Sequence, residues 1–214
     1  GTEAVAEKEI VRRDGAGVWI PTEIKAGQNI ASRGNERRAG ESALEVGAVL
    51  SPLAIAVLAS IGRTQVLAIP RPRLALITTG DELSRGGDVG PAQIRDSNGP
   101  MLAAMARAAG LTEIKIDHAA DNPDSLRAAL ERALEFKPNI VALTGGVSEG
   151  NYDIVPDALT AIGARTVFHK VNQRPGKPLL FAADDQSGRL FFGLPGNPLS
   201  CQLGFHRYIR GAIR

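Results

Sequence analysis

Cysteine is almost absent from this sequence: Cys201 is the only one in 214 residues, so an internal disulfide is excluded and a reducing, cytoplasmic location is predicted. Aromatic residues make up 4% of the chain, too few for a surface that stacks nucleic-acid bases. The most apolar stretch, residues 53–61, is far too short to span a bilayer. No signal peptide is visible, because the N-terminus lacks a basic segment followed by an apolar one. The net charge of +2 argues against nucleic-acid and membrane partners.

Several common catalytic signatures are also missing. The sequence has no Ser-His-Asp arrangement, no P-loop ending in Gly-Lys-Ser/Thr and no Cys-x-x-Cys pair. The three histidines, at positions 118, 169 and 206, lack the spacing of metal ligands and are interpreted as surface or core residues. Cys201 has no apparent activating partner, so we expect a small buried apolar side chain and not a nucleophile.

What the sequence does contain is typical of a globular α/β protein: 43% apolar residues, 22% charged residues and 24 glycines. This length suffices for one good core, or for one domain with a smaller annex. The chain opens on Gly1 with what looks like mid-sequence material, so we expect a part of a longer protein.

The first third of the chain predicts a β-rich and mixed segment over residues 1–70. Residues 1–30 contain short runs broken by Gly and Asp, which indicate strands and a hairpin. Residues 31–42 are polar and predict a loop. Ser51-Pro52 favours a helix start, with Gly62 at its end and a strand over 65–69. Pro70-Arg71-Pro72 is the best linker candidate, which places the second domain at 71–214.

After Pro72 the pattern is strand, loop, helix, repeated. This alternation predicts a mostly parallel sheet with helices on both faces, a three-layer α/β/α domain in which ligands collect at the carboxyl ends of the strands. The predicted strands cover 74–78, 112–116, 139–143, 166–170, 179–182 and 190–193, and the predicted helices cover 100–109, 121–136, 154–162 and 199–213.

Charged side chains follow the predicted strands. Carboxylates suit a hard cation such as Mg²⁺, whereas Lys, Arg and backbone N–H groups suit phosphate or another oxyanion. Together they indicate a phosphorylated ligand handled with a metal. The acidic and histidine members are Asp81, Glu82, Asp117, His118, Asp121 and Asp153, and the basic members are Lys170, Arg174 and Lys177.

The turn over residues 144–153 is rich in glycine and joins a predicted strand to a predicted helix. Bare N–H groups at a helix N-terminus form a ready anion site, although many such turns are only tight turns. Asp153 stands where either an N-cap or a metal-binding carboxylate would stand. Glu149 adds a negative charge beside the proposed anion site, which is unfavourable there without a cation.

Structural interpretations remain open for other residues of the set. Asp96 and Asp121 would serve equally well as N-caps, and Asp81-Glu82 as a solvated turn. Ser200 would serve as an ordinary first-turn helix residue.

Five motifs follow one another in a family-specific order and spacing: Thr79-Gly80-Asp81-Glu82-Leu83, Asp96-Ser97-Asn98, Thr144-Gly145-Gly146-Val147-Ser148 with Gly150 and Asp153, Pro175-Gly176-Lys177-Pro178, and Leu194-Pro195-Gly196-Asn197-Pro198. They resemble the MoeA/gephyrin E-domain family, the molybdopterin molybdenumtransferases. The upstream segments Gly27-Gln28-Asn29-Ile30 and Arg33-Gly34 resemble it too. The resemblance implies a three-layer molybdopterin-binding domain, an elongated homodimer, and further N- and C-terminal parts that make this chain a central fragment.

The resemblance also implies a reaction: Mg²⁺-dependent insertion of molybdate into adenylylated molybdopterin, with release of AMP. Molybdopterin is then the small-molecule partner, with the upstream adenylyltransferase and downstream molybdoenzymes as protein partners. The implied catalytic residues are Glu82, Asp121, Asp153, Lys170 and Lys177, and the implied metal ligands are Glu36, Glu82 and Asp153. The implied substrate-binding residues are Gly80, Asp81, Asp96, Ser97, Thr144, Gly145, Gly146, Ser148, Arg174, Pro178, Gly196, Asn197 and Ser200.

Three departures from the family pattern stand out, and one of them is Glu149, which stands where the family often has an apolar or small residue. Glu36 replaces an Asp with a carboxylate one methylene longer, and Arg174 replaces a Lys point charge with a planar fork. Two alternatives also remain: a molybdopterin adenylyltransferase, whose usual Thr-Gly-Gly-Thr-Gly turn is absent here, and a non-catalytic molybdopterin-binding or scaffold module.

Overall fold

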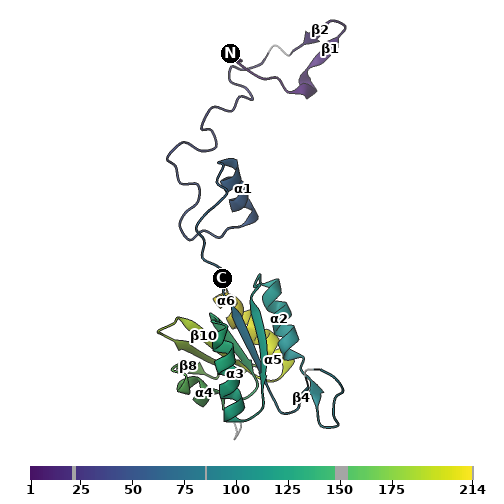
Figure 1. Ribbon diagram of the computed structural model, residues 1–214. Coiled ribbons are helices and arrows are strands. Elements are labelled where there is room, and N and C mark those ends of the chain that lie inside the picture. The colour runs from purple at the N-terminus through teal and green to yellow at the C-terminus, as the bar shows by residue number, and fades with distance from the viewer. Residues whose placement is uncertain (21–22, 85, 148–153, 214) are drawn as a thin grey trace. The chain divides into compact units, whose positions relative to one another are not determined.

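The computed structural model describes residues 1–20, 23–84, 86–147 and 154–213 (Figure 1). The chain divides into two compact units, Gly1–Ala68 and Ile69–Arg214. In the described residues, every helix is too short or too polar to cross a bilayer.

The first unit contains little regular structure. A short 3-10 turn, η1 (Lys8–Ile10), precedes the predicted hairpin, in which β1 (Arg12–Asp14) pairs antiparallel with β2 (Gly17–Trp19). The predicted helix is α1 (Pro52–Ser60), whose first turn is capped by the Ser51 hydroxyl, which accepts from the Ala54 N–H at 3.2 Å.

The strand predicted over residues 65–69 is wrong. The chain there is exposed throughout and forms no ladder. An apolar run becomes a strand only when a neighbouring strand takes up its backbone N–H and C=O groups, and no described segment does so here.

The second unit is built on a six-stranded sheet with the order β6-β3-β7-β10-β9-β8. The four strands from β6 to β10 are parallel, whereas β9 runs antiparallel to both of its neighbours. The strands are β3 (Leu74–Thr79), β6 (Ile114–Ala119), β7 (Ile140–Thr144), β8 (Arg165–His169), β9 (Leu180–Asp184) and β10 (Arg189–Leu194).

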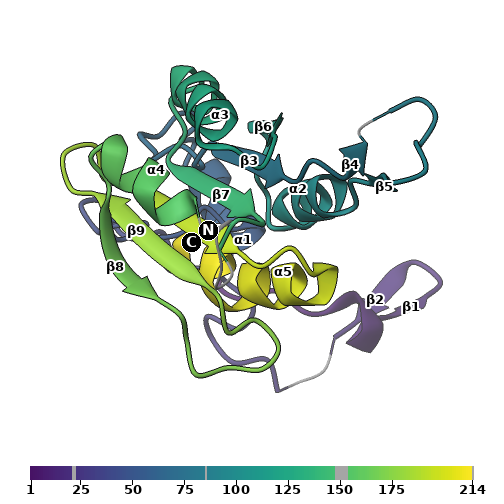
Figure 2. The ribbon, with the colours of Figure 1, turned by 90° about the horizontal axis from the view of Figure 1, so that it is seen from below.

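Helices cover both faces of this sheet, as Figure 2 shows: α3 and α4 lie on one side, α2 and α5 on the other. The predicted mostly parallel α/β fold is therefore confirmed. A two-residue ladder between β4 (Leu83–Ser84) and β5 (Ile94–Arg95) projects beyond the end of β3. The helical segments are α2 (Asn98–Ala108), α3 (Pro123–Glu135), α4 (Val155–Ala161), α5 (Pro198–Gly204), the π-helical turn η2 (Phe205–Ile209) and α6 (Arg210–Ala212).

Alternate residues of the central strands fill two cores. In β3, Leu74 and Leu76 pack on the side of α2 and η2, whereas Ala75 and Ile77 pack on the side of α3 and α4. All four are buried. This two-sided burial explains why β3 is a continuous apolar run instead of an alternating pattern.

Strand β6 extends three residues further than predicted, and this moves two residues away from the strand end. Asp117 and His118 lie within the ladder, opposite Ile77 and Thr78. Asp117 forms an ion pair with Arg132 of α3 at 2.8 Å. Burial opposes ionisation of Asp117, but the hydrogen bonds from Arg132 and the His118 N–H outweigh it and lower the pKa of the carboxyl. Asp117 is therefore a structural partner of α3 and does not join the edge.

Gly193 of β10 tests how tightly the sheet packs on its α4 side. A Cβ at this position would lie 2.6 Å from Val147 Cγ1 and 3.2 Å from Leu180 Cβ. We expect Gly193→Ala to lower the free energy of unfolding by about 1–3 kcal/mol, because the buried neighbours must shift. Urea denaturation measures this, and Gly211→Ala, with open space around its Cβ, is the control. Equal stability of the two variants would contradict the packing described.

Candidate functional site

The register of the sheet brings the ends of its parallel strands to one edge. Thr78 of β3 pairs with Thr144 of β7, which in turn pairs with Leu194 of β10. Thr79 pairs with Ala119 at the end of β6. The antiparallel β9 starts at the same edge, because Leu180 pairs with Gly193 of β10 and with the end of β8. The turns that follow β3, β6, β7, β8 and β10 therefore open on one side, whereas the turn between β9 and β10 lies at the opposite edge.

At one end of the edge two acidic turns are tied together. The Asp81 N–H donates to Asp121 Oδ2 at 3.3 Å, and the Asp121 N–H donates to Asp81 Oδ1 at 3.0 Å. The neighbouring Glu82 carboxylate folds back over Gly80, where a Cβ would lie 2.6 Å from Glu82 Oε2. Each aspartate thus uses one carboxylate oxygen to accept from the backbone N–H of the other turn.

The same geometry settles two of the open interpretations. The side chain that caps α3 is Asn122, whose Oδ1 accepts from the Ser125 N–H at 2.9 Å, so Asp121 is not the N-cap. Asp81 is not merely a solvated turn residue, since it holds the turn after β6. In the part of the chain that the structure describes, Asp81, Glu82 and Asp121 have no ion-pair partner.

The middle of the edge is bare backbone. Gly145 and Gly146 have φ values of 88° and 62°, in the left-handed region that favours glycine. A Cβ on Gly145 would lie 2.5 Å from Thr79 Oγ1, and Gly196 is in ordinary van der Waals range of Gly145, since its own Cβ would lie 4.0 Å from the Gly145 Cα. Thr144 is buried beneath this surface. Ser148 and Asp153, predicted for the same turn, lie outside the described residues.

Asp96 fixes the start of α2 against the sheet. Its Oδ2 accepts from the Thr78 hydroxyl at 3.0 Å and its Oδ1 accepts from the Gly99 N–H at 3.0 Å. Both oxygens are thus engaged within the chain, as the capping interpretation expects, and direct ligand binding by Asp96 stays a prediction. Ser97 is exposed and its side chain makes no capping hydrogen bond.

Asn98 is a residue that sequence reasoning quoted in a motif but did not assign to the site. Its Nδ2 donates to the Gly196 carbonyl at 2.7 Å, which joins α2 to the turn after β10. Its Oδ1 is buried and has no hydrogen-bond partner among the described residues. The Asp96-Ser97-Asn98 motif was the only available signal, and it does not show which helix or turn the amide reaches.

The other end of the edge is basic. The β8–β9 loop, residues 170–178, presents the exposed side chains of Lys170, Arg174 and Lys177, with Pro178 half-buried. Its base is closed by two backbone hydrogen bonds, from Lys170 N–H to the Leu179 carbonyl at 2.8 Å and from Val171 N–H to the Lys177 carbonyl at 2.9 Å. Within the described parts of the chain, Arg174 and Lys177 make no ion pair.

Ser200 and Asn197 connect the basic end with the glycine-rich middle. Asn197 caps α5, where its Oδ1 accepts from the N–H groups of Leu199 at 3.0 Å and Ser200 at 3.4 Å. Ser200 is buried in the first turn, and its carbonyl lies 3.9 Å from where a Cβ of Gly176 would stand. The first turn of α5 therefore packs against the basic loop.

The sheet order separates the two kinds of charge. The sequence predicted that acidic and basic groups share one edge, and they do, but β7, β10 and β9 lie between β3 and β8. Four strand intervals of about 4.8 Å place the acidic and basic ends roughly 19 Å apart. Such a site suits an elongated ligand that carries a metal-binding group at one end and an oxyanion at the other.

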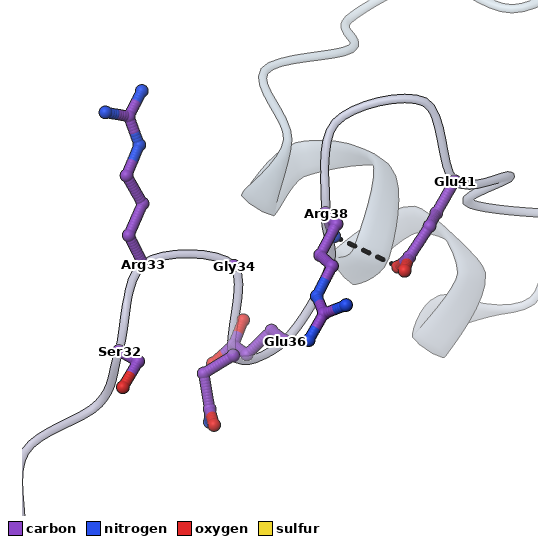
Figure 3. Close-up of a pocket in the computed structure, with 7 residues that line it drawn as sticks. Ser32, Arg33, Gly34, Glu36, Arg38 and Glu41 are labelled. Atoms are coloured by element: carbon purple, nitrogen blue, oxygen red, sulfur yellow. Dashed lines mark hydrogen bonds between the residues drawn. The ribbon is translucent and has the colours of Figure 1, made fainter.

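The predicted metal ligands come from three places. Glu82 lies at the acidic end of the edge, Asp153 lies outside the described residues, and Glu36 belongs to the first unit. Figure 3 shows Glu36 in a polar pocket where the Arg38 N–H donates to Glu41 Oε2 at 3.0 Å. Across the described ranges, no three His, Cys, Asp or Glu side chains are grouped closely enough to hold a metal ion. The oxygen donors of Asp81, Glu82 and Asp121 nevertheless match the ligand preference of Mg²⁺.

The fold and this edge define a ligand-binding α/β domain, and comparison with known proteins gives its family. A family model described as a probable molybdopterin binding domain matches residues 75–214, so the chain belongs to that family.

Individual relatives agree with this assignment. The molybdopterin molybdenumtransferase of Staphylococcus aureus (strain Mu50 / ATCC 700699) is 40% identical over 188 residues, which cover 87% of this chain and 44% of the relative. The molybdopterin molybdenumtransferase of Staphylococcus epidermidis (strain ATCC 35984 / DSM 28319 / BCRC 17069 / CCUG 31568 / BM 3577 / RP62A) is 37% identical over 216 residues, which cover 100% of this chain and 50% of the relative. A crystal structure of a molybdopterin biosynthesis MoeA protein from Pyrococcus horikosii superposes with a TM-score of 0.72 at 27% identity, covering 99% of this chain and 53% of that one.

These similarities confirm the MoeA/gephyrin resemblance that the ordered motifs predict, and they support a place in molybdenum cofactor biosynthesis. The chain spans about half the length of the curated relatives it matches.

Cys201 lies beside this edge, but its surroundings make its thiol unreactive. It is buried, and its thiol donates to the Pro195 carbonyl at 2.8 Å. Burial, with a smaller contribution from the Asp96 charge, raises the pKa of the thiol to about 12.

We therefore expect native protein at pH 8 to resist iodoacetamide. About one thiol in ten thousand would be ionised there, against roughly a quarter for an unperturbed cysteine with a pKa of about 8.5. Mass spectrometry should show labelling at least about 100-fold slower than in 8 M urea at the same pH. Comparable rates in the two conditions would contradict the burial of Cys201.

Proposed function

We propose that this chain binds molybdopterin for molybdenum insertion, taking adenylylated molybdopterin and molybdate as substrates and releasing AMP with Mg²⁺ as the cofactor. The observation that carries the proposal is the single sheet edge on which carboxylates and a basic loop flank a bare backbone surface; among the described residues, Asp121, Arg174 and Lys177 of this edge make no ion pair. The relatives named as molybdopterin molybdenumtransferases support the same reaction.

The basic loop is assigned to the oxyanions. Arg174 offers a planar fork of donors to phosphate or molybdate oxygens, and Lys177 offers a point charge. Lys170 lies at the base of the loop, and the buried Ser200 lies beneath the loop in the first turn of α5.

The glycine-rich middle is assigned to the body of the ligand. Gly145, Gly146 and Gly196 lack side chains, so a ligand can approach their backbone closely. The amide of Asn98 sits beside this surface and fixes the Gly196 turn. A phosphate or a pterin ring would thus be held without displacing any side chain.

The acidic end is assigned to Mg²⁺. Glu82 and Asp121, together with Asp153, would act on the metal and the pyrophosphate, and the ion when bound would neutralise the phosphate charge that the carboxylates alone would repel. The reciprocal hydrogen bonds between Asp81 and Asp121 keep the two turns at a fixed distance before any ligand arrives. We further propose that the protein acts as a cytoplasmic homodimer.

The basic loop gives the first test of this function. Replacing Lys177 with Gln should raise the Kd for molybdopterin about tenfold or more, because a hydrogen bond from a charged donor contributes about 1.5–3 kcal/mol. Anaerobic isothermal titration calorimetry measures the affinity. Arg127→Gln is the matched control, since Arg127 is exposed on α3 and forms an ion pair with Asp124 of the same helix. No binding by the unaltered chain, or equal weakening by the control, would contradict the proposal.

The acidic end of the edge gives the second test of the proposed function. Asp121→Asn keeps a carbonyl oxygen that can accept from the Asp81 N–H but removes the charge, so the Mg²⁺ concentration for half-maximal AMP release should rise about tenfold while the unfolding midpoint stays the same. Asp124→Asn, on the exposed start of α3, serves as the control. An unchanged Mg²⁺ requirement would remove Asp121 from the metal site. ATP-dependent adenylylation of molybdopterin by the unaltered chain would instead establish the adenylyltransferase alternative.

A further inference from the structure

The basic loop has no regular secondary structure, yet its cations must be held in place to bind an oxyanion well. The two backbone hydrogen bonds at its base fix only residues 170, 171, 177 and 179. Its tip, residues 172–176, carries Arg174 and needs a separate support.

The side chain and the backbone of Gln173 both make hydrogen bonds within the loop. Its Nε2 donates to the Pro175 carbonyl at 3.0 Å, and its backbone N–H donates to the Val171 carbonyl at 2.9 Å. Gly176, at φ 96°, makes room for the amide, since a Cβ there would lie 2.7 Å from Gln173 Nε2. A side chain at Gly176 would thus expel the amide that braces the loop.

Tyr208 holds the other end of the same amide. Its hydroxyl donates to Gln173 Oε1 at 3.2 Å. The orientation of the amide is fixed, because the Pro175 carbonyl can only accept and so requires the NH₂ group on its side. The two hydrogen bonds therefore depend on one another.

The tyrosine is itself anchored in the core. It belongs to the π-helical turn η2, in which Phe205 and Ile209 are buried, and its partly buried side chain packs against the core. Its ring contacts Phe168 near the end of β8, with ring centroids 6.4 Å apart. π-helical turns widen a helix locally and recur at functional sites. Here the turn places Tyr208 toward the loop that follows β8.

We propose that Gln173 and Tyr208 are positioning residues that hold the oxyanion-binding loop in its binding conformation. The inference rests on the proposed function for its ligand, but the bracing of the loop is a property of the free protein. Neither side chain needs to touch the ligand. The Tyr208 hydroxyl acts through the Gln173 amide, and the amide sets the backbone that carries Arg174 and Lys177.

The decisive experiment compares Tyr208→Phe, Gln173→Ala and the double variant. Tyr208→Phe removes only the hydroxyl and keeps the ring contact with Phe168. Amide hydrogen exchange of residues 170–179, followed by mass spectrometry without ligand, should accelerate about five- to tenfold in each single variant. The double variant should exchange no faster than Gln173→Ala, because both changes break one linked unit. Gln186→Ala, an exposed glutamine in the β9–β10 turn, should behave as wild type.

Ligand binding gives the second readout. The Kd for molybdopterin should rise about five- to tenfold in both single variants, and Gln173→Glu should fail equally, because a carboxylate cannot donate to the Pro175 carbonyl. The urea midpoint should stay at the wild-type value in Tyr208→Phe. Wild-type exchange and affinity in Tyr208→Phe, or additive effects in the double variant, would overturn the proposal. Faster exchange in a chain that binds no molybdopterin would support the brace while refuting the proposed function.

Discussion

The structure depends above all on the parallel pairing of β3 with β6 and β7, and of β7 with β10. Parallel strands that lie side by side must end at the same edge, so this pairing gathers turns from residues 80, 120, 145 and 195 into one place. Burial of β3 and β7 on both faces fixes the register, because a slip of one residue would exchange the two cores. The site is thus a consequence of core packing.

Around that edge, the polar side chains fall into two groups with different roles. The first group makes hydrogen bonds within the chain, to the first turns of helices and to the Gly196 turn, and consists of Asp96, Asn98, Asn122 and Asn197. Other charged groups at the edge find no ion-pair partner among the described residues: Asp81, Glu82, Asp121, Arg174 and Lys177. The first group makes the edge rigid, and the second leaves it electrostatically unsatisfied. Such a division is expected of a binding site whose scaffold is formed before the ligand arrives.

The arrangement of charge also bears on the size of the ligand. Carboxylates and cations that shared a single turn would neutralise one another, as Arg132 of α3 and Asp117 of β6 do. Three intervening strands prevent this at the edge. The resulting separation of roughly 19 Å, from the spacing of about 4.8 Å per strand, matches a ligand with two charged ends better than a lone oxyanion.

The sequence alone determined the alternation of strands and helices, the two-sided burial of the strands and the order of the motifs, since these follow from local apolar pattern and glycine placement. It therefore predicted the fold, the family and the shared edge. Tertiary structure decided what depends on partners distant in the chain. Asp117 forms an ion pair with Arg132, and residues 65–69 form no strand. The Asp81 N–H donates to the Asp121 carboxylate, and the Tyr208 hydroxyl donates to the Gln173 amide. No local pattern encodes these pairings, because each joins segments that only the packed sheet brings together.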